Sequence, residues 1–259
     1  MKITKIEKKK RLYLLEFDNL KKIYVTEDTI VRFMLTKGKS LTENELVDIE
    51  TFAQESYAKD LALYYISFQA RTENEIQQYL KKHDITEPII IKVVSHLKEK
   101  KWIDDDLFIK STIESNLNHG DKGPKQIKQK LFQKGITLTR IDKLLENYDF
   151  QNVSDRIANK AFKKYYKKYP LNQLKLKIKT FLAQKGFSTE MITISLKKLP
   201  LEKDETQEKN LLDKELEKQY RKYSKKYQGY ELKQRLIQSL FRKGFGYDDI
   251  KSRYKDFFE

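Results

Sequence analysis

Consecutive carboxylates are the first candidates for chemistry in this sequence. Asp104, Asp105 and Asp106 stand side by side, and clustered carboxylates can hold Mg²⁺. Nothing nearby in the sequence completes a metal or nuclease site around them. We therefore expect the three residues to cap and begin the next helix, where negative charge complements the helix dipole.

Histidines and glycines offer no better site. The three histidines include no pair spaced four residues apart, and the sequence has no cysteine to act as ligand or nucleophile. Gly120 and Gly123 precede Pro124, but a phosphate-binding loop would need a preceding strand, so this pattern favours a turn before a helix. The sequence therefore predicts a protein that is not an enzyme and has no cofactor.

Positive charge is the stronger signal. The chain has 54 Lys and Arg against 38 Asp and Glu, which gives a net charge of +16 and a pI near 9.5. The excess is uneven, because residues 151–200 contain 12 basic residues and only two acidic ones, Asp155 and Glu190. This distribution favours polyanions or acidic proteins as partners.

Pairs of lysine and tyrosine alternate between residues 160 and 169. On a continuous helix these lysines would share one face and neutralise phosphates, while the tyrosines pack or stack. We call these lysines the first stripe: Lys160, Lys163, Lys164, Lys167 and Lys168. The second stripe stands further along the chain: Arg221, Lys222, Lys225 and Lys226. Three lysines of the intervening helix complete the candidate binding residues: Lys175, Lys177 and Lys179. The alternative is a solvated basic face whose tyrosines close the core.

A repeated segment shows which elements must position these residues. Leucines at 80, 131, 182 and 240 recur at spacings of 51, 51 and 58 residues, each within a similar segment. In the last three copies Lys-Gly and Ile or Phe follow the leucine, at 134–136, 185–187 and 243–245. This pattern is typical of a helix that ends at a glycine cap, after which the apolar residue folds back on the core. Four repeats of three helices each are predicted.

The first forty residues differ from the rest. They alternate apolar and polar positions with a turn at Asp18-Asn19, which indicates strands of a small meander. Thr42 and Glu45 then form a capping-box pattern at the start of a helix. The predicted fold is mainly α, with tandem three-helix repeats in an elongated, curved array and a small N-terminal β-rich extension. The predicted domains are the extension at 1–41 and repeats at 42–105 (with a lead-in helix), 106–152, 153–202 and 203–259.

The first and second repeats resemble the RecX family of RecA regulators. In the first repeat the residues that carry the resemblance are 62–67, 71–76, Leu80, Leu97-Lys98 and 102–108. In the second they are 123–127, Leu131 and 134–136. The likeness covers residues 60–250 and is weaker in the third and fourth repeats. The sequence departs from the family pattern at His83-Asp84, Ala70 and Ile109, where Lys-Gly, Pro and Ala are usual.

The resemblance implies a modular array that binds RecA and RecA–single-stranded DNA filaments, with no chemistry of its own. It implies modulation, in the direction of inhibition, of filament assembly, ATPase, recombinase and coprotease activities, and so a place in DNA repair, recombination and the SOS response. Whether the stripes contact DNA directly or acidic patches of RecA stays open. A general DNA-binding module or transcriptional regulator is the alternative, because three-helix units with basic faces also fit a duplex groove.

The cellular location is a separate expectation. The N-terminal residues lack the apolar segment of a signal peptide, and no stretch approaches the ~18 apolar residues of a membrane span. The absence of cysteine fits a reducing compartment. We expect a cytoplasmic protein with no membrane partner.

Overall fold

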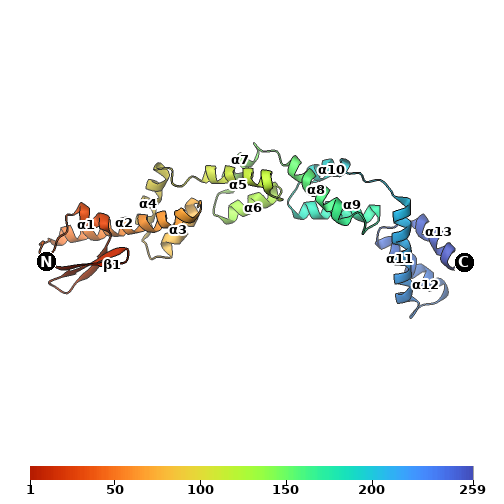
Figure 1. Cartoon of the computed structure of the whole chain (residues 1–259), viewed down its shortest axis with the longest axis horizontal. Coiled ribbons are helices and arrows are strands. Elements are labelled where there is room, and N and C mark those ends of the chain that lie inside the picture. Colours follow the sequence, from red (N-terminus) through yellow and green to blue (C-terminus); the bar gives the residue numbers. More distant parts are fainter. Residues whose placement is uncertain (259) are drawn as a thin grey trace. The chain divides into compact units, whose positions relative to one another are not determined.

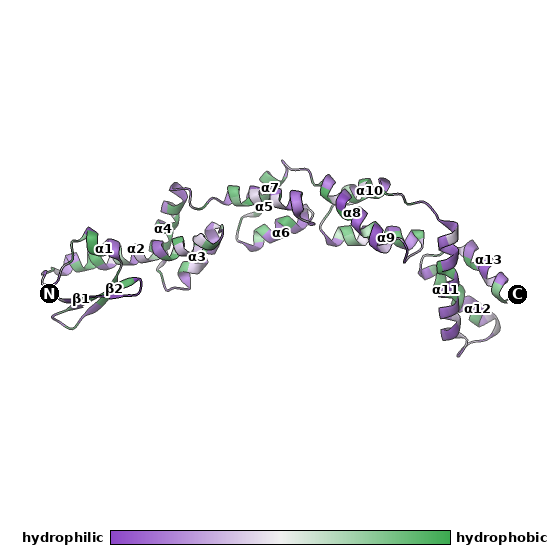
Figure 2. Ribbon diagram, viewed as in Figure 1, coloured by the Kyte–Doolittle hydropathy of each residue, from purple (hydrophilic) through white to green (hydrophobic). Residues whose placement is uncertain are grey.

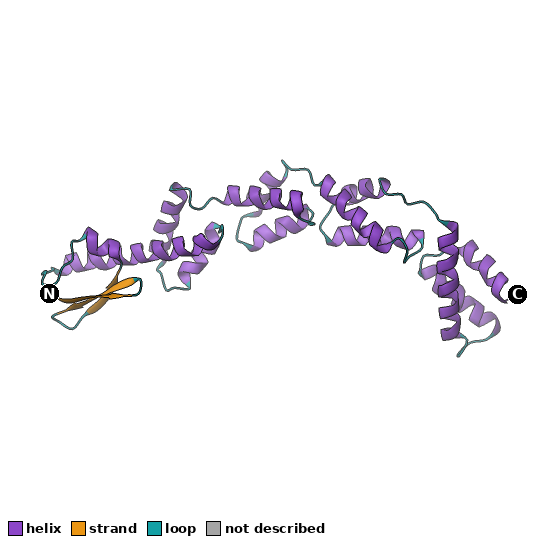
Figure 3. Cartoon of the chain, viewed as in Figure 1, coloured by secondary structure: helices purple, strands orange, loops and turns teal. Residues whose placement is uncertain are grey.

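The structure, a computed structural model, describes residues 1–258. Within that range it has one three-stranded sheet at the N-terminus, followed by thirteen helices (Figure 3). The mainly α fold with a small N-terminal β region is therefore confirmed.

The N-terminal sheet is an antiparallel meander of β1 (Ile3–Lys9), β2 (Leu12–Phe17) and β3 (Lys22–Val25). It is followed by a short helix, α1 (Glu27–Arg32), which the strand-only interpretation of residues 1–41 missed. Thr26 caps this helix by accepting a hydrogen bond from the Thr29 backbone N–H at 3.3 Å. The Thr-Glu-Asp sequence at 26–28 was the available signal, because hydroxyl caps and acidic first turns mark helix starts.

The remaining helices follow in sets of three (Figure 1). The first set is α2 (Glu43–Phe68), α3 (Glu73–Lys81) and α4 (Glu87–Glu99), and the second is α5 (Asp105–His119), α6 (Pro124–Gln133) and α7 (Leu138–Leu145). The third set is α8 (Gln151–Tyr165), α9 (Leu171–Gln184) and α10 (Thr189–Lys197), and the fourth is α11 (Glu205–Tyr223), α12 (Gly229–Arg242) and α13 (Tyr247–Phe258). The exact boundaries of the repeats stay a prediction.

Helix α2 joins the N-terminal extension to the first repeat. It begins with the predicted capping box, in which the Thr42 hydroxyl accepts from Glu45 N and the Glu45 carboxylate accepts from Thr42 N. Its first half contributes Leu46 and Ile49 to the core beneath the sheet, whereas Ala58 and Ala62 in its second half pack with α3 and α4. The helix serves two cores because the buried residues of its first half and those of its second half lie on opposite faces.

Each of the first two Lys-Gly helix ends meets the second helix of the preceding repeat. The Lys134 carbonyl oxygen accepts hydrogen bonds from Thr72 Oγ1 at 2.7 Å and Asn74 Nδ2 at 3.4 Å. The Lys185 carbonyl oxygen accepts one from the Gly123 backbone N–H at 2.7 Å. The carbonyl groups at a helix end have no partner within their own helix, and these two contacts supply one. We call these contacts, and the approach of Gly244 to the start of α9, the repeat junctions.

Glycine is needed at the junctions for two reasons. Gly135, Gly186 and Gly244 have φ values of +86°, +89° and +93°, which strain a residue with a side chain. A Cβ on Gly135 would also lie 2.2 Å from the Asn74 side chain, and one on Gly244 would lie 2.9 Å from Gln173 Cβ. The Lys-Gly sequence thus ends one helix and lets that helix end pack closely against a neighbouring repeat.

The first repeat shows why His83-Asp84 is tolerated in place of Lys-Gly. Asp84 has the left-handed φ of +59°, a conformation that short polar side chains adopt more readily than others. Its side chain is exposed, and no three-helix repeat precedes it in the chain. Because no junction forms at this helix end, no close contact there requires glycine.

The described chain packs as two compact units. One comprises residues 1–111 with 131–141, and the other comprises residues 112–130 with those from 142 onward. The division passes through the second repeat. The end of its helix α6, at Lys134, forms a junction within the first unit, and Gly123, just before α6, forms one within the second. The elongated, curved form expected for the array stays a prediction.

Candidate functional site

The first stripe begins on the last turns of α8. Lys160, Lys163 and Lys164 are exposed there, while Ile157 and Ala161 are buried. Figure 2 shows hydrophilic and hydrophobic residues interleaved along the helices. An amphipathic helix with this pattern holds its lysines outward because burying an ammonium group without a partner is costly. The side-chain placement required for contact with a polyanion is therefore present.

The prediction that all five lysines share one helix face is wrong. Helix α8 ends at Tyr165, and Lys167 and Lys168 lie in the turn that follows. Pro170 lies just beyond this turn, and the residue before a proline is disfavoured in the helical conformation. Both lysines are nevertheless exposed, so the stripe continues from a helix end onto a turn.

The first stripe has no carboxylate partners. Among the residues that the structure describes, none of its five lysines forms an ion pair, and neither do Lys175, Lys177 and Lys179, which are exposed on α9. Of the two acidic residues between 151 and 200, Asp155 is held by Lys198 and by the hydroxyl of Ser195. The positive charge of this surface is thus left uncompensated by the chain itself.

Aromatic rings accompany the lysines. Lys164 Nζ lies 5.3 Å from the ring centroid of Tyr165, and Lys177 Nζ lies 5.5 Å from that of Tyr169. The two tyrosine rings lie 6.0 Å apart in an edge-to-face arrangement. Both rings are partly buried, so the tyrosines pack against the repeat while remaining accessible.

The second stripe begins at the end of α11. Arg221 and Lys222 belong to the last turn of this helix, whereas Lys225 and Lys226 lie beyond it; all four are exposed. Arg221 forms an ion pair with Glu217 at 3.5 Å. This stripe therefore repeats the first in position but is partly neutralised.

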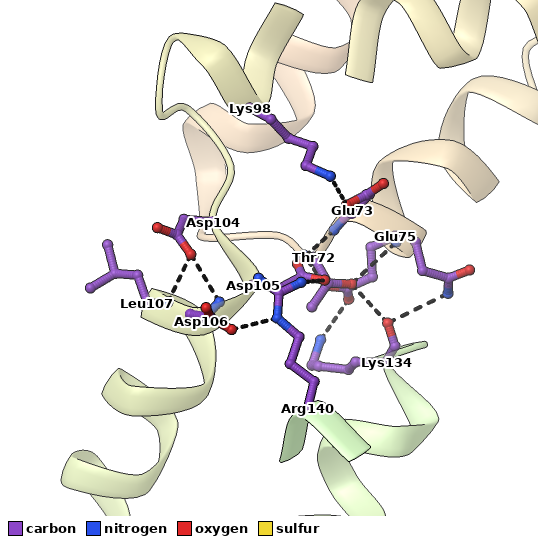
Figure 4. A network of polar contacts seen from close by, with 11 residues as sticks. Thr72, Glu73, Glu75, Lys98, Asp104, Asp105, Asp106, Leu107, Lys134 and Arg140 are labelled. Carbon is purple, nitrogen blue, oxygen red and sulfur yellow. Dashed lines mark hydrogen bonds and ion pairs between the residues drawn. The ribbon is translucent and has the colours of Figure 1, made fainter. Parts of the chain in front are cut away.

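The acidic run has two structural roles. Asp104 accepts hydrogen bonds from the backbone N–H groups of Asp106 and Leu107, as a helix cap does, and this role is confirmed. Asp105 instead reaches the start of α3, where it accepts from Glu73 N at 2.9 Å, and lies 3.7 Å from Arg140 (Figure 4). Nothing in the run's spacing indicated this second contact.

The surroundings of the first junction shift two carboxyl groups in opposite directions. Burial raises the pKa of Asp105 above its ordinary value, although the hydrogen bond from Glu73 N and the charge of Arg140 oppose the change. Burial also opposes ionisation of Glu75, but hydrogen bonds from Lys134 Nζ and Thr72 N outweigh it and lower the pKa. These shifts arise from burial and from the contacts of a structural junction.

The junction lysines are held by carboxylates, unlike those of the first stripe. Lys134 Nζ contacts Glu75 Oε1 at 2.5 Å, and Lys185 Nζ contacts the Asp121 carboxylate. Sequence reasoning assigned the Lys-Gly lysines to the helix dipole and missed these partners, which lie 59 and 64 residues away. Only the recurrence of the motif in successive repeats could have suggested them.

No three His, Asp or Glu side chains of residues 1–258 gather closely enough to hold a metal ion. None of the helices in that range combines the length and apolar character of a membrane span.

Three segments of the chain match domains of one known family. The family description "RecX, third three-helix domain" matches residues 155–194 and again residues 206–252, and "RecX, first three-helix domain" matches residues 58–97. The third and fourth repeats therefore resemble one and the same domain type. How closely each repeat follows the family pattern stays a prediction.

Curated relatives and solved structures extend the likeness. "Regulatory protein RecX" of Streptococcus mutans is 51% identical over 257 residues, covering 99% of this chain and 100% of the relative. The protein of that name from Streptococcus pneumoniae strain Hungary19A-6 is 52% identical over the same shares. A crystal structure of regulatory protein RecX matches with a TM-score of 0.60 and 31% identity, over 76% of this chain and 99% of that one. RecX from Lactobacillus salivarius matches with a TM-score of 0.54 and 31% identity, over 57% and 98%.

Proposed function

The chain belongs to the RecX family of regulatory proteins, and we propose that it regulates the RecA recombinase by binding RecA and RecA–single-stranded DNA filaments. In this proposal it inhibits filament assembly and, with it, the ATPase, recombinase and coprotease activities of RecA. The chain acts by occupying a surface and performs no reaction. Its place of action is the cytoplasm, in DNA repair, recombination and the SOS response.

The observation that carries the proposal is the uncompensated charge of the third repeat. Eight exposed lysines on α8, on α9 and in the turn between them lack a carboxylate partner in the described chain: Lys160, Lys163, Lys164, Lys167, Lys168, Lys175, Lys177 and Lys179. A nucleoprotein filament supplies phosphates and carboxylates to such a surface, and binding releases the counterions that surround them. Arg221, Lys222, Lys225 and Lys226 of the second stripe extend the same chemistry to the fourth repeat.

The junctions support a role as a scaffold. Repeats joined through helix ends present several surfaces on one chain, and linked surfaces bind a repeating partner more tightly than each would alone. A regulator of this kind bridges filament subunits and hinders their addition or turnover. Each repeat then contacts a different part of the filament, because their charges differ.

The test is the single-stranded DNA-dependent ATPase of RecA, measured with and without this protein. We expect inhibition, together with shortened filaments in electron micrographs, at fewer than one copy of this protein per RecA subunit. Unchanged ATPase and filament length over that range would overturn the proposal. Sequence-specific footprints on duplex DNA in the absence of RecA would instead favour the alternative of a transcriptional regulator.

A further inference from the structure

The third and fourth repeats carry the same group of side chains 58 residues apart. Tyr165 and Tyr169 lie 6.0 Å apart between ring centroids, and their counterparts Tyr223 and Tyr227 lie 6.3 Å apart. This offset equals that between the repeat leucines at 182 and 240. We call each such pair of rings a tyrosine pair.

The cations around the tyrosine pairs recur as well. Lys164 lies 5.3 Å from the Tyr165 ring centroid, and its counterpart Lys222 lies 5.4 Å from that of Tyr223. On the second ring of each pair, Lys177 over Tyr169 corresponds to Arg235 over Tyr227, at 5.5 and 5.0 Å. Two copies of one arrangement, down to the cation over each ring, are therefore present.

The repeat frame does not require this arrangement. At the positions of the tyrosine pair the second repeat has Glu114 and Asn118, and the first has Leu63 and Ser67, yet both form helices there. A phenylalanine would also serve for packing. None of the four tyrosine hydroxyls forms a hydrogen bond with another residue in the described range 1–258. Hydrogen bonding within the described chain therefore does not account for the four tyrosines.

We propose that the two tyrosine pairs are stacking sites for the bases of single-stranded nucleic acid, with the flanking lysines binding its phosphates. The inference rests on the proposed function, because it identifies the single-stranded nucleic acid of the filament as the ligand of the basic surface. Aromatic faces bind bases of any sequence, but only where the bases are unpaired. The surrounding lysines supply the charge complementarity that phosphates need.

The cation over each ring suggests how the strand enters. An ammonium or guanidinium group over an exposed tyrosine face is held more weakly than a stacked base. A phosphate draws Lys164 or Lys222 away, and a base takes the ring face that the cation leaves. The free protein thus keeps its rings covered until a strand arrives.

The test measures binding of a fluorescent oligothymidylate to the whole chain, without RecA. Replacing Tyr165 and Tyr223 together by Leu removes one ring of each pair while keeping an apolar side chain. We expect the dissociation constant to rise roughly tenfold, which corresponds to the lower part of the range for loss of base stacking. The double Tyr→Phe variant is the matched control and should bind within about twofold of the wild type, because phenylalanine also stacks.

A second probe needs no variant, so it remains decisive if the leucine substitutions unfold the repeat. An oligonucleotide of abasic residues has the phosphates but no bases, and we expect the wild type to bind it roughly tenfold more weakly than oligothymidylate at equal salt. Equal binding of the two strands would overturn the inference. So would wild-type affinity in a leucine variant whose circular dichroism and melting temperature show that it is folded.

The outcome is separable from that of the proposed function. If RecA ATPase is inhibited while the abasic and thymidylate strands bind equally, this inference fails and the proposed function stands. If the bases are needed for binding but RecA is unaffected, the inference stands and the proposed function fails.

Discussion

The Thr72 hydroxyl donates a hydrogen bond to the carbonyl oxygen of Lys134 over 2.7 Å, although 62 residues separate them. The same oxygen atom of Thr72 accepts from Glu75 N at 3.2 Å, so one side chain caps the start of α3 and the end of α6. This buried hydroxyl turns a local cap into a link between repeats.

Replacing Thr72 by Val should therefore destabilise the chain by about 1–3 kcal/mol. Valine has the shape of threonine but removes the acceptor of Glu75 N and leaves the Lys134 carbonyl oxygen only the longer hydrogen bond from Asn74. The free energy of unfolding in urea, followed by circular dichroism, is the measurement. Thr72→Ser keeps the hydroxyl and should recover most of the loss. A valine variant as stable as the serine variant would show that the link contributes nothing.

The glycine of the first junction should tolerate no side chain. Gly135→Ala combines a φ of +86° with a Cβ placed 2.2 Å from Asn74, so we expect a loss of about 2–4 kcal/mol. Gly38 is the matched control, since its φ is +91° but the nearest atom to an added Cβ, Lys2 Cε, lies 3.9 Å away. Gly38→Ala should cost only the backbone strain, about 1–2 kcal/mol. Equal losses in the two variants would contradict the close approach at the junction.

Acidification should weaken the first junction through Glu75. Its pKa is lowered in the folded chain, so its contribution to stability is full above the ordinary glutamate value of 4.5. That contribution is lost as the pH falls through the lowered folded value. Thermal unfolding of the wild type and of Glu75→Gln should show melting temperatures that converge as the pH drops below 4.5. A constant difference across this range would argue against an ionised Glu75–Lys134 pair.

Reversing the charge of the first stripe should weaken binding to filaments and to DNA. With Lys163, Lys164, Lys167 and Lys168 changed to Glu, the dependence of affinity on salt should become shallower while helicity is kept. Titration at several salt concentrations measures the slope. The control reverses four exposed lysines of the first two repeats that have no ion pair in the described chain: Lys82, Lys100, Lys110 and Lys130. If both variants weaken binding equally, net charge and not the stripe is responsible.

The fourth repeat should become a stronger binding surface when its acidic residues are removed. Glu217 and Glu231 pair with Arg221 and Arg235 at 3.5 and 3.6 Å, whereas the third repeat has Asn159 and Gln173 at the corresponding positions. Glu217→Asn with Glu231→Gln should therefore increase affinity for oligothymidylate by about threefold to tenfold at low salt. The reverse exchange of Asn159 to Glu should lower it. No change in either direction would show that the strand does not reach these arginines.

Much of the local structure was predictable, because the signals act over a few residues. The strand alternation, the Thr42–Glu45 capping box and the glycine helix ends each depend on neighbours within about one helical turn, so their residue types show in the sequence. The recurrence of Leu80, Leu131, Leu182 and Leu240 likewise determined that the chain repeats a three-helix unit. The unequal charge of the repeats follows from composition alone.

Tertiary structure decided the contacts between segments distant in sequence. The seating of Lys134-Gly135 on α3 and the capping of α3 by Asp105 join residues 32 to 62 positions apart, and no local propensity specifies them. The break in the first stripe after Tyr165, by contrast, had a local signal, because Pro170 stands five residues further on as the N-cap of α9. The sequence determined the repeated unit and its charges, whereas packing decided which helix end meets which and how the lysines and tyrosines are grouped. The physical reason is that helix caps act within one turn of the backbone, while junctions form only when folded repeats bring their unsatisfied ends together.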